Sequence, residues 1–216
     1  MKILVLCDDK WHPVEIIEKG IRLLENKDYQ FDLVMDAKDI LTPELLNSYQ
    51  VVMNCKGNAI TGANAAPWFE ETVTEVTPKE FRQYVEQGGG FLSVHAGNTF
   101  SAMDGTGYSD LVGNSFVTHP PRCLVTVHVS AKHPITEGVQ DFTERDEHYN
   151  IDHLAEDIQP FLSTTSQTGG TQMGGYARTL GKGRICVLTP GHTLSVWENE
   201  NYQKLIHNAI DWCCGK

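Results

Sequence analysis

The clearest chemical signature in the chain is a histidine at the end of a short apolar run. Residues 88–97 read Gly-Gly-Gly-Phe-Leu-Ser-Val-His-Ala-Gly, which places His95 between small neighbours. This pattern is typical of a nucleophile elbow, where small residues permit a strained turn that projects one side chain. Hydrolytic elbows carry Ser or Cys at this point, whereas a histidine suits general acid–base catalysis or metal ligation. We therefore predict that His95 is a functional residue.

Two more histidines and a carboxylate lie in segments that fix the backbone. His119 is followed by two prolines, which hold its backbone extended. His192 follows an apolar run and Gly191, which lets the chain turn sharply. Glu147 lies in a dense titratable stretch, and a carboxylate near a pocket histidine can exchange protons with it or orient its ring. The predicted catalytic residues are His95, His119, Glu147 and His192.

The same side chains are also a donor set for a metal ion. Three imidazoles and a carboxylate can bind Zn²⁺ or a similar divalent ion. The sequence contains no H-x-H or H-E-x-x-H motif that would identify such a site. Metal-free acid–base groups and metal ligands therefore stay open as alternatives, and the candidate ligands are His95, His119 and His192.

Alternating strand and helix patterns in the first half predict the scaffold of these residues. Apolar runs typical of strands buried on both faces occur at residues 3–7, 31–35, 51–54 and 90–94. Between them, residues 14–24 have apolar side chains at helical spacing. Thr42-Pro43 and Thr77-Pro78 are typical of helix starts. The alternation predicts an α/β fold with a mostly parallel sheet and helices on both faces.

The second half is less regular. Strands are expected at residues 122–130, 160–166 and 184–189, with a hairpin between 176–180 and 184–188 and a last helix over 199–213. Residues 56–76 show no period and are expected to form a long loop. Since there is no repeat or linker, we predict one domain over residues 1–216.

Ligands of open parallel sheets bind beyond the carboxyl ends of the strands, so the loops there should converge. These loops carry polar groups, and aromatic side chains whose faces suit the C–H face of a sugar. The predicted substrate-binding residues are Asp8, Trp11, His12, Asn58, Asn98, Tyr149 and Trp197. Trp68 stays open between a core position and a sugar contact.

Composition excludes several classes of function. A formal net charge of -11 disfavours nucleic acid or an anionic membrane as the partner. The sequence has no apolar run of about 20 residues and no signal peptide, so a cytoplasmic protein is expected. The six cysteines form no C-x-x-C pair and are expected to be reduced. A small-molecule ligand is the expected partner, with a homodimer as the default oligomer.

The order of short motifs along the chain resembles the ThuA-like (trehalose-utilisation) family. They are the glycine run ending at His95, Thr-His119-Pro, His133-Pro-Ile-Thr-x-Gly138, Asp146-Glu147-x-Tyr149, Gly181-Lys-Gly-Arg184, Gly191-His192 and Asn208-Ala-Ile-x-Trp212. The resemblance implies a flavodoxin-like three-layer α/β/α sandwich, similar to the class I glutamine amidotransferase-like group. It also implies a role in the metabolism of trehalose or a related sugar or keto-sugar. The elbow cysteine of that group is replaced by His95, so glutamine amidotransferase chemistry is not expected.

Three functions are therefore compared. The leading hypothesis is a hydrolase, lyase or isomerase that acts on a sugar derivative through His/Glu acid–base or metal-assisted chemistry. The alternative is a non-catalytic sugar-binding or regulatory module. An amidase or peptidase with Cys55 as nucleophile is disfavoured, because no histidine lies at a sequence spacing from Cys55 that would identify it as the catalytic partner.

Overall fold

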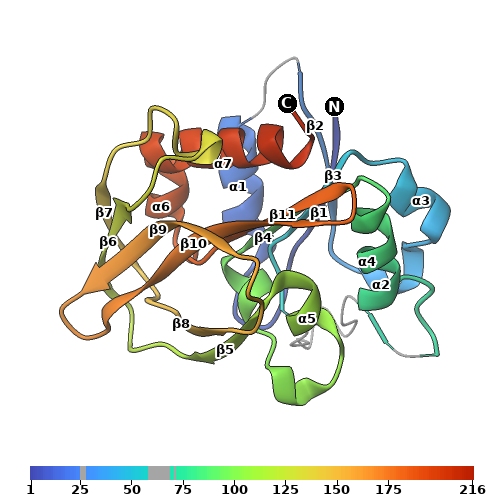
Figure 1. Ribbon diagram of the computed structural model, residues 1–216, viewed down its shortest axis with the longest axis horizontal. Coiled ribbons are helices and arrows are strands. Elements are labelled where there is room, and N and C mark those ends of the chain that lie inside the picture. The colour runs from blue at the N-terminus through green and yellow to red at the C-terminus, as the bar shows by residue number, and fades with distance from the viewer. Residues whose placement is uncertain (25–27, 58–68, 71) are drawn as a thin grey trace.

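A mixed β-sheet forms the middle of the molecule (Figure 1), in a computed structural model that describes residues 1–24, 28–57, 69–70 and 72–216. In this part of the chain the sheet has nine strands, in the order β2-β1-β3-β4-β11-β10-β9-β6-β7. The first five in that order are parallel: β2 (Gln30–Val34), β1 (Lys2–Leu6), β3 (Val51–Asn54), β4 (Gly90–Val94) and β11 (Gly183–Leu188). This is the flavodoxin-like strand order, and it confirms the predicted α/β fold.

Four antiparallel strands extend the parallel core on one side. They are β10 (Gly170–Leu180), β9 (Gln159–Ser166), β6 (Cys123–Val129) and β7 (Phe142–Asp146). The pairing of β10 with β11 is the predicted hairpin. A separate ribbon pairs β5 (Asn114–Thr118) with β8 (Asn150–His153). The sequence pattern does not indicate β5, β7 or β8, because these strands are short and carry mostly polar residues.

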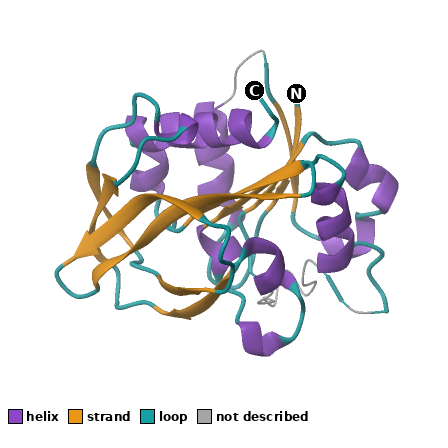
Figure 2. Ribbon diagram, in the orientation of Figure 1, coloured by secondary structure: helices purple, strands orange, loops and turns teal. Residues whose placement is uncertain are grey.

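Helices cover both faces of the parallel core (Figure 2). One layer consists of α1 (Val14–Leu24), α6 (Leu194–Glu198) and α7 (Glu200–Cys213). The other consists of α2 (Ala37–Ile40), α3 (Pro43–Asn47), α4 (Pro78–Glu86) and α5 (Tyr108–Val112). Three 3₁₀ turns complete the described elements: η1 (His95–Asn98), η2 (Ala102–Asp104) and η3 (Pro134–Thr136).

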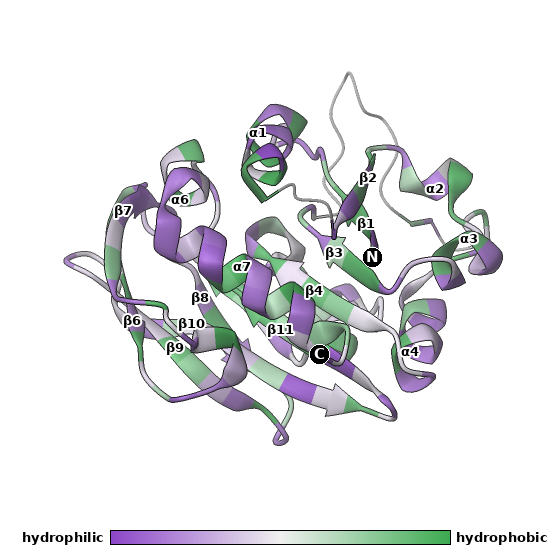
Figure 3. Cartoon of the chain, turned by 90° about the horizontal axis from the view of Figure 1, so that it is seen from above, coloured by the Kyte–Doolittle hydropathy of each residue, from purple (hydrophilic) through white to green (hydrophobic). Residues whose placement is uncertain are grey.

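Alternation along β1 divides the hydrophobic core in two. Ile3 and Val5 pack in the cluster under α1, α6 and α7, whereas Leu4 and Leu6 pack in the opposite cluster. Successive strand side chains point to opposite faces, and burial of both faces explains the continuous apolar run. Hydrophobic and hydrophilic bands alternate along α7 (Figure 3), as expected for a helix with one face on the core.

Helix starts follow the local chemistry predicted from the sequence. The Thr42 hydroxyl accepts a hydrogen bond from the backbone N–H of Leu45 at 3.2 Å, at the start of α3. Thr77 and Glu80 form a reciprocal capping box at the start of α4, where the Glu80 carboxylate accepts from the Thr77 N–H at 3.0 Å. None of the helices in the described part of the chain is both long and apolar enough to cross a membrane.

Trp197 fixes the packing of α6 on α1. Its side chain is 1% exposed, its indole N–H donates to the Gly191 carbonyl at 2.9 Å, and its ring fills the space where a Cβ at Gly20 would lie. Trp11, in contrast, is 64% exposed.

We expect Trp197→Ala to lower the free energy of unfolding by about 3–5 kcal/mol, because it leaves a large cavity in the core. The matched substitution Trp11→Ala should change it by less than about 0.5 kcal/mol. Equilibrium urea denaturation of both variants measures the difference. Equal effects of the two substitutions would contradict this packing role for Trp197.

Candidate functional site

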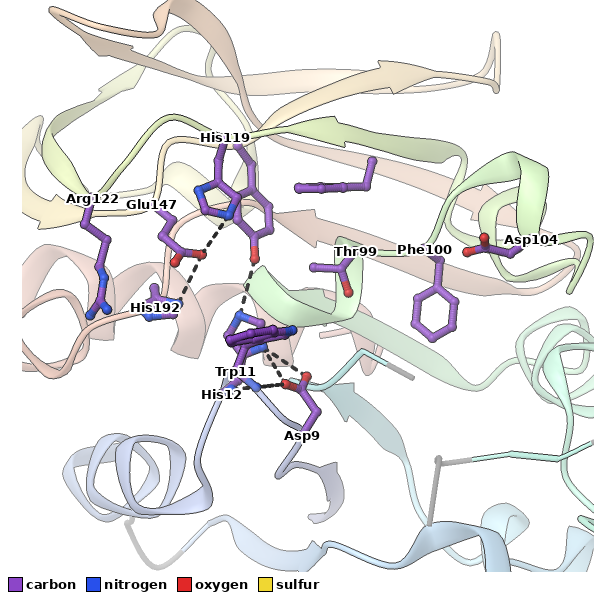
Figure 4. Close-up of a pocket in the computed structure, with 12 residues that line it drawn as sticks. Asp9, Trp11, His12, Thr99, Phe100, Asp104, His119, Arg122, Glu147 and His192 are labelled. Atoms are coloured by element: carbon purple, nitrogen blue, oxygen red, sulfur yellow. Dashed lines mark hydrogen bonds and ion pairs between the residues drawn. The ribbon is translucent and has the colours of Figure 1, made fainter. Parts of the chain in front are cut away.

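A cavity of about 630 Å³ opens beyond the carboxyl ends of the parallel strands (Figure 4). This is the position at which open α/β sheets bind ligands. The loops after β1, β4, β7 and β11 all contribute to it, together with β5. Its lining residues are Asp9, Trp11, His12, Thr99, Phe100, Asp104, Phe116, His119, Arg122, Glu147, Tyr149 and His192.

His95 stands on the predicted elbow, at the buried base of the site. Its φ of 41° is the left-handed conformation that non-glycine residues rarely adopt. Gly97 is required beside it, because a Cβ there would lie 2.4 Å from the Asn54 carbonyl oxygen. The ring Nδ1 lies 2.8 Å from the Thr189 carbonyl, to which it donates. Burial lowers the pKa of His95 to about 4, so its ring is neutral at pH 7 with the Nε2 lone pair turned toward the cluster.

Glu147 lies at the centre of three imidazoles. Its Oε2 is 3.2 Å from His192 Nδ1, 3.5 Å from His95 Nε2 and 3.6 Å from His119 Nε2. His95 Nε2 and His192 Nδ1 are themselves 3.2 Å apart. Burial alone would raise the pKa of Glu147, but the contact with His192 holds that pKa well below its usual range. The structure therefore brings together all four side chains predicted to be catalytic.

The loop after β1 adds a fourth imidazole. His12 Nδ1 lies 2.8 Å and 3.0 Å from the two Asp9 carboxylate oxygens. The same carboxylate accepts backbone N–H groups of Trp11 and Gly57, at 2.8 Å and 2.7 Å. Burial opposes ionisation of Asp9, yet the hydrogen bond with His12 lowers its pKa. Ligand atoms of His12, His95, Glu147 and His192 all lie within 4.8 Å of one another.

A second buried carboxylate shapes the loop that carries His192. Asp146, at the end of β7, accepts the backbone N–H groups of Gly191 and His192 at 2.8 Å and 2.9 Å. Burial raises the pKa of Asp146 to about 6, against the opposing effect of these N–H groups. Gly191 has a φ of 138°, and a Cβ there would lie 2.6 Å from the Tyr202 hydroxyl.

Aromatic rings form one wall of the cavity. Tyr149 stacks on His95 with ring centroids 4.1 Å apart, and Phe116 meets Tyr149 edge-on at 5.1 Å. The Tyr149 hydroxyl lies 3.4 Å from His12 Nε2. His119, which follows β5, stacks with Tyr149 with ring centroids 5.6 Å apart, and its Nδ1 lies 2.9 Å from the Pro120 carbonyl. Trp11 lines the cavity with a largely exposed ring.

Three of the predicted substrate-binding residues do not reach the cavity. Asn98 is fully buried and donates to the Leu188 carbonyl at 2.9 Å, so it joins η1 to β11. Trp197 is buried between α6 and α1, where no ligand can stack on it. Asp8 has a φ of 70° and accepts the Val14 N–H at 3.1 Å, at the start of α1. Asn98 and Trp197 therefore pack in the interior and Asp8 forms a turn, in place of the ligand contacts predicted for them.

Three other predicted residues have different outcomes. Asn58 and Trp68 lie outside the residues that the structure describes. Cys55 is buried, and burial raises the pKa of its thiol well above the usual value. A protonated, inaccessible thiol is a poor nucleophile, which removes support from the amidase hypothesis.

Sequence reasoning missed several lining residues, which are Asp9, Thr99, Phe100, Asp104, Phe116 and Arg122. Asp9 follows a predicted strand beside His12, so the rule that selected His12 could also have selected it. Phe116 and Arg122 lie three residues before and three residues after His119 in the sequence. Only the position of β5 in the folded chain brings these side chains to the cavity. Arg122 also lines the cavity and is drawn on the same side of the view as Glu147 and His192 (Figure 4).

Comparison with known proteins gives matches over nearly the whole chain. The family model described as trehalose utilisation (ThuA) matches residues 2–213. A ThuA-like protein from Bacteroides uniformis is 20% identical with a TM-score of 0.74, over 99% of this chain and 91% of that one. A cytoplasmic protein from Salmonella typhimurium is 14% identical with a TM-score of 0.70, over 99% of both chains. No curated protein matches the sequence at a significant level.

A domain-sized part of a larger enzyme also shares the fold. A β-galactosidase from Bacillus circulans sp. alkalophilus is 13% identical with a TM-score of 0.66, over 97% of this chain but 30% of that one. At such identities, these solved structures establish the fold alone.

Asp146→Asn tests the buried carboxylate that fixes the His192 loop. An amide offers one acceptor oxygen and turns an N–H group toward a backbone N–H, so we expect a loss of about 1–3 kcal/mol in unfolding free energy. The control Asp152→Asn, at an exposed position, should stay within about 0.5 kcal/mol. Chemical denaturation at pH 8 measures both variants. If Asp146→Asn is as stable as the control, its two N–H contacts do not stabilise the loop.

Proposed function

The chain belongs to the ThuA family of trehalose utilisation, and from this premise we propose that it is an enzyme acting on a sugar or sugar derivative. Family membership ties the chain to carbohydrate utilisation. The reaction class that fits the cavity is proton transfer at a hydroxyl or carbonyl group of the sugar, as in a hydrolase, lyase or isomerase.

The observation that carries this proposal is the contact of one carboxylate with three imidazoles inside a cavity. Glu147 Oε2 lies within 3.6 Å of ring nitrogens of His95, His119 and His192. General acid–base catalysis requires such groups within reach of one another and of the substrate.

The cavity suits a ligand of sugar size. Its volume of about 630 Å³ lies in the range of small-molecule sites, roughly 300–1,000 Å³. Trp11 and Phe116 supply aromatic surfaces, and Asp104 and Thr99 supply hydroxyl-binding oxygens. One end of the cavity therefore offers acid–base groups and the rest offers surfaces that bind polyols.

The cellular location, the partner and the oligomeric state of the enzyme are part of the same proposal. We place it in the cytoplasm, in line with the similar Salmonella typhimurium proteins that are described as cytoplasmic. Its partner is a small sugar molecule, with neither nucleic acid nor a membrane as ligand, and a homodimer is its expected oligomer. The net charge of -11 supports the exclusion of polyanionic partners.

The test is incubation of the purified protein with trehalose, glucose and mixed keto-sugars, followed by NMR detection of product. For any sugar that is converted, His95→Ala and Glu147→Gln should each lower kcat/KM by about 10²–10⁴-fold. The control His153→Ala changes an exposed histidine away from the cavity and should keep wild-type activity. Turnover that is unchanged in both cavity variants would contradict the proposal.

Sugar binding distinguishes the alternative function, a non-catalytic binding or regulatory module. Binding of a sugar without turnover, together with binding that survives His95→Ala, would favour this alternative over the enzyme.

A further inference from the structure

Hydrogen bonds hold one ring nitrogen of His95 and one of His12, and leave the other nitrogen of each ring available as a metal ligand. His95 donates its Nδ1–H to the Thr189 carbonyl at 2.8 Å, and its Nε2 faces His192 and Glu147. His12 donates its Nδ1–H to the Asp9 carboxylate at 2.8 Å, and its Nε2 lies 3.4 Å from the Tyr149 hydroxyl. One ligand atom of each of these histidines lies within 4.8 Å of those of Glu147 and His192. Imidazole nitrogens and a carboxylate oxygen gathered this closely are ligand types that bind transition-metal ions.

The spacing of these atoms matches a metal coordination shell. The edges between His95 Nε2, His192 Nδ1 and Glu147 Oε2 measure 3.2, 3.2 and 3.5 Å. Ligand atoms about 2.1 Å from a tetrahedral ion lie roughly 3.4 Å from one another. The three atoms therefore have the spacing of one triangular face of such a shell, and a ring nitrogen of His12 lies within 4.8 Å of the other ligand atoms.

We propose that His12, His95, Glu147 and His192 bind one divalent first-row transition-metal ion, with Zn²⁺ as the reference ion. Three imidazoles and one carboxylate are a donor set that binds such ions and not Mg²⁺ or Ca²⁺, which take oxygen ligands. The ligand set differs from the one predicted from the sequence, since His12 takes the place of His119.

Outer contacts of these ligands follow the pattern seen in metal sites. A metal-bound histidine donates its other N–H to a carboxylate or a backbone carbonyl, which fixes the tautomer and the ring. Asp9 supplies the carboxylate for His12, and Thr189 supplies the carbonyl for His95. The Asp146 carboxylate accepts the backbone N–H of His192 and so fixes the backbone there.

The assignment leaves His119 as the histidine that stays free of the metal. Its side chain is 34% exposed, and its Nε2 lies 3.6 Å from the Glu147 carboxylate. A bound ion would polarise a sugar carbonyl or hydroxyl in the cavity, and His119 would exchange a proton with that sugar. This division of roles rests on the proposed function, whereas the metal site does not.

The experiment measures metal binding without any sugar. Untagged protein is stripped with chelator, dialysed and titrated with ZnCl₂ by isothermal calorimetry, with bound zinc counted by elemental analysis. We expect about one Zn²⁺ per chain. Co²⁺ added instead should give visible absorption bands of a nitrogen- and oxygen-ligated ion.

Variants then assign the ligands. His12→Ala and the nearly isosteric Glu147→Gln should each weaken Zn²⁺ binding by at least about 10-fold, and Asp9→Asn should weaken it by about 10–100-fold. His119→Ala and His153→Ala should bind Zn²⁺ like the wild type. Circular dichroism identifies any variant that fails to fold, and the Co²⁺ spectrum of folded Asp9→Asn reports the site independently.

Two results would overturn the metal site: no stoichiometric Zn²⁺ in the wild type, or a loss in His119→Ala equal to that in His12→Ala. Stoichiometric zinc lost in His12→Ala but kept in His119→Ala would support the site. Zinc binding without sugar turnover would leave the metal site standing and would refute the proposed enzyme.

Discussion

The parallel pairing of β11 with β4 is the constraint on which the site depends. Leu188 of β11 lies opposite Val94 of β4, so both strands end at the same level of the sheet. The next residues, Thr189 and His95, are therefore neighbours, and the Thr189 carbonyl accepts the His95 Nδ1–H. That hydrogen bond determines which ring nitrogen faces the cavity, although 94 residues separate the two partners.

The elbow adds a local constraint to this pairing. A histidine with positive φ costs about 1–3 kcal/mol, and such strain persists only where the surroundings hold it in place. Here the surroundings are rigid, because Ala96, Gly97 and Asn98 are all buried and Asn98 donates to the Leu188 carbonyl. Strain at a residue that contacts cavity-lining side chains, as His95 contacts Glu147 and His192, is typical of functional sites and agrees with the role proposed for His95.

The antiparallel extension completes what the parallel core begins. The core alone brings His12, His95 and His192 to one edge of the sheet, together with Asp9, whose carboxylate contacts His12. β7 ends at Asp146, whose carboxylate accepts N–H groups from the loop after β11. Glu147 is thereby placed between the histidines. The ribbon of β5 and β8 brings Phe116 and His119 over the same cavity. Two structural modules thus share one site, and without the antiparallel extension the core histidines would lose Glu147 and His119.

The sequence by itself determined the parallel strands, the helices α1, α3, α4 and α7, the elbow and most residues of the cluster. Apolar runs, caps and glycine turns are local signals, so they indicate where β4 ends and why His95 is projected there. The strand order and the pairing of β7 with β6 are long-range properties that no local pattern specifies. For this reason only the tertiary structure decided that His12 joins the cluster, that Asp9 orients it, and that Trp197 belongs to the core. Burial and distance depend on which strands lie side by side, and the side chains acquire their chemistry from that arrangement.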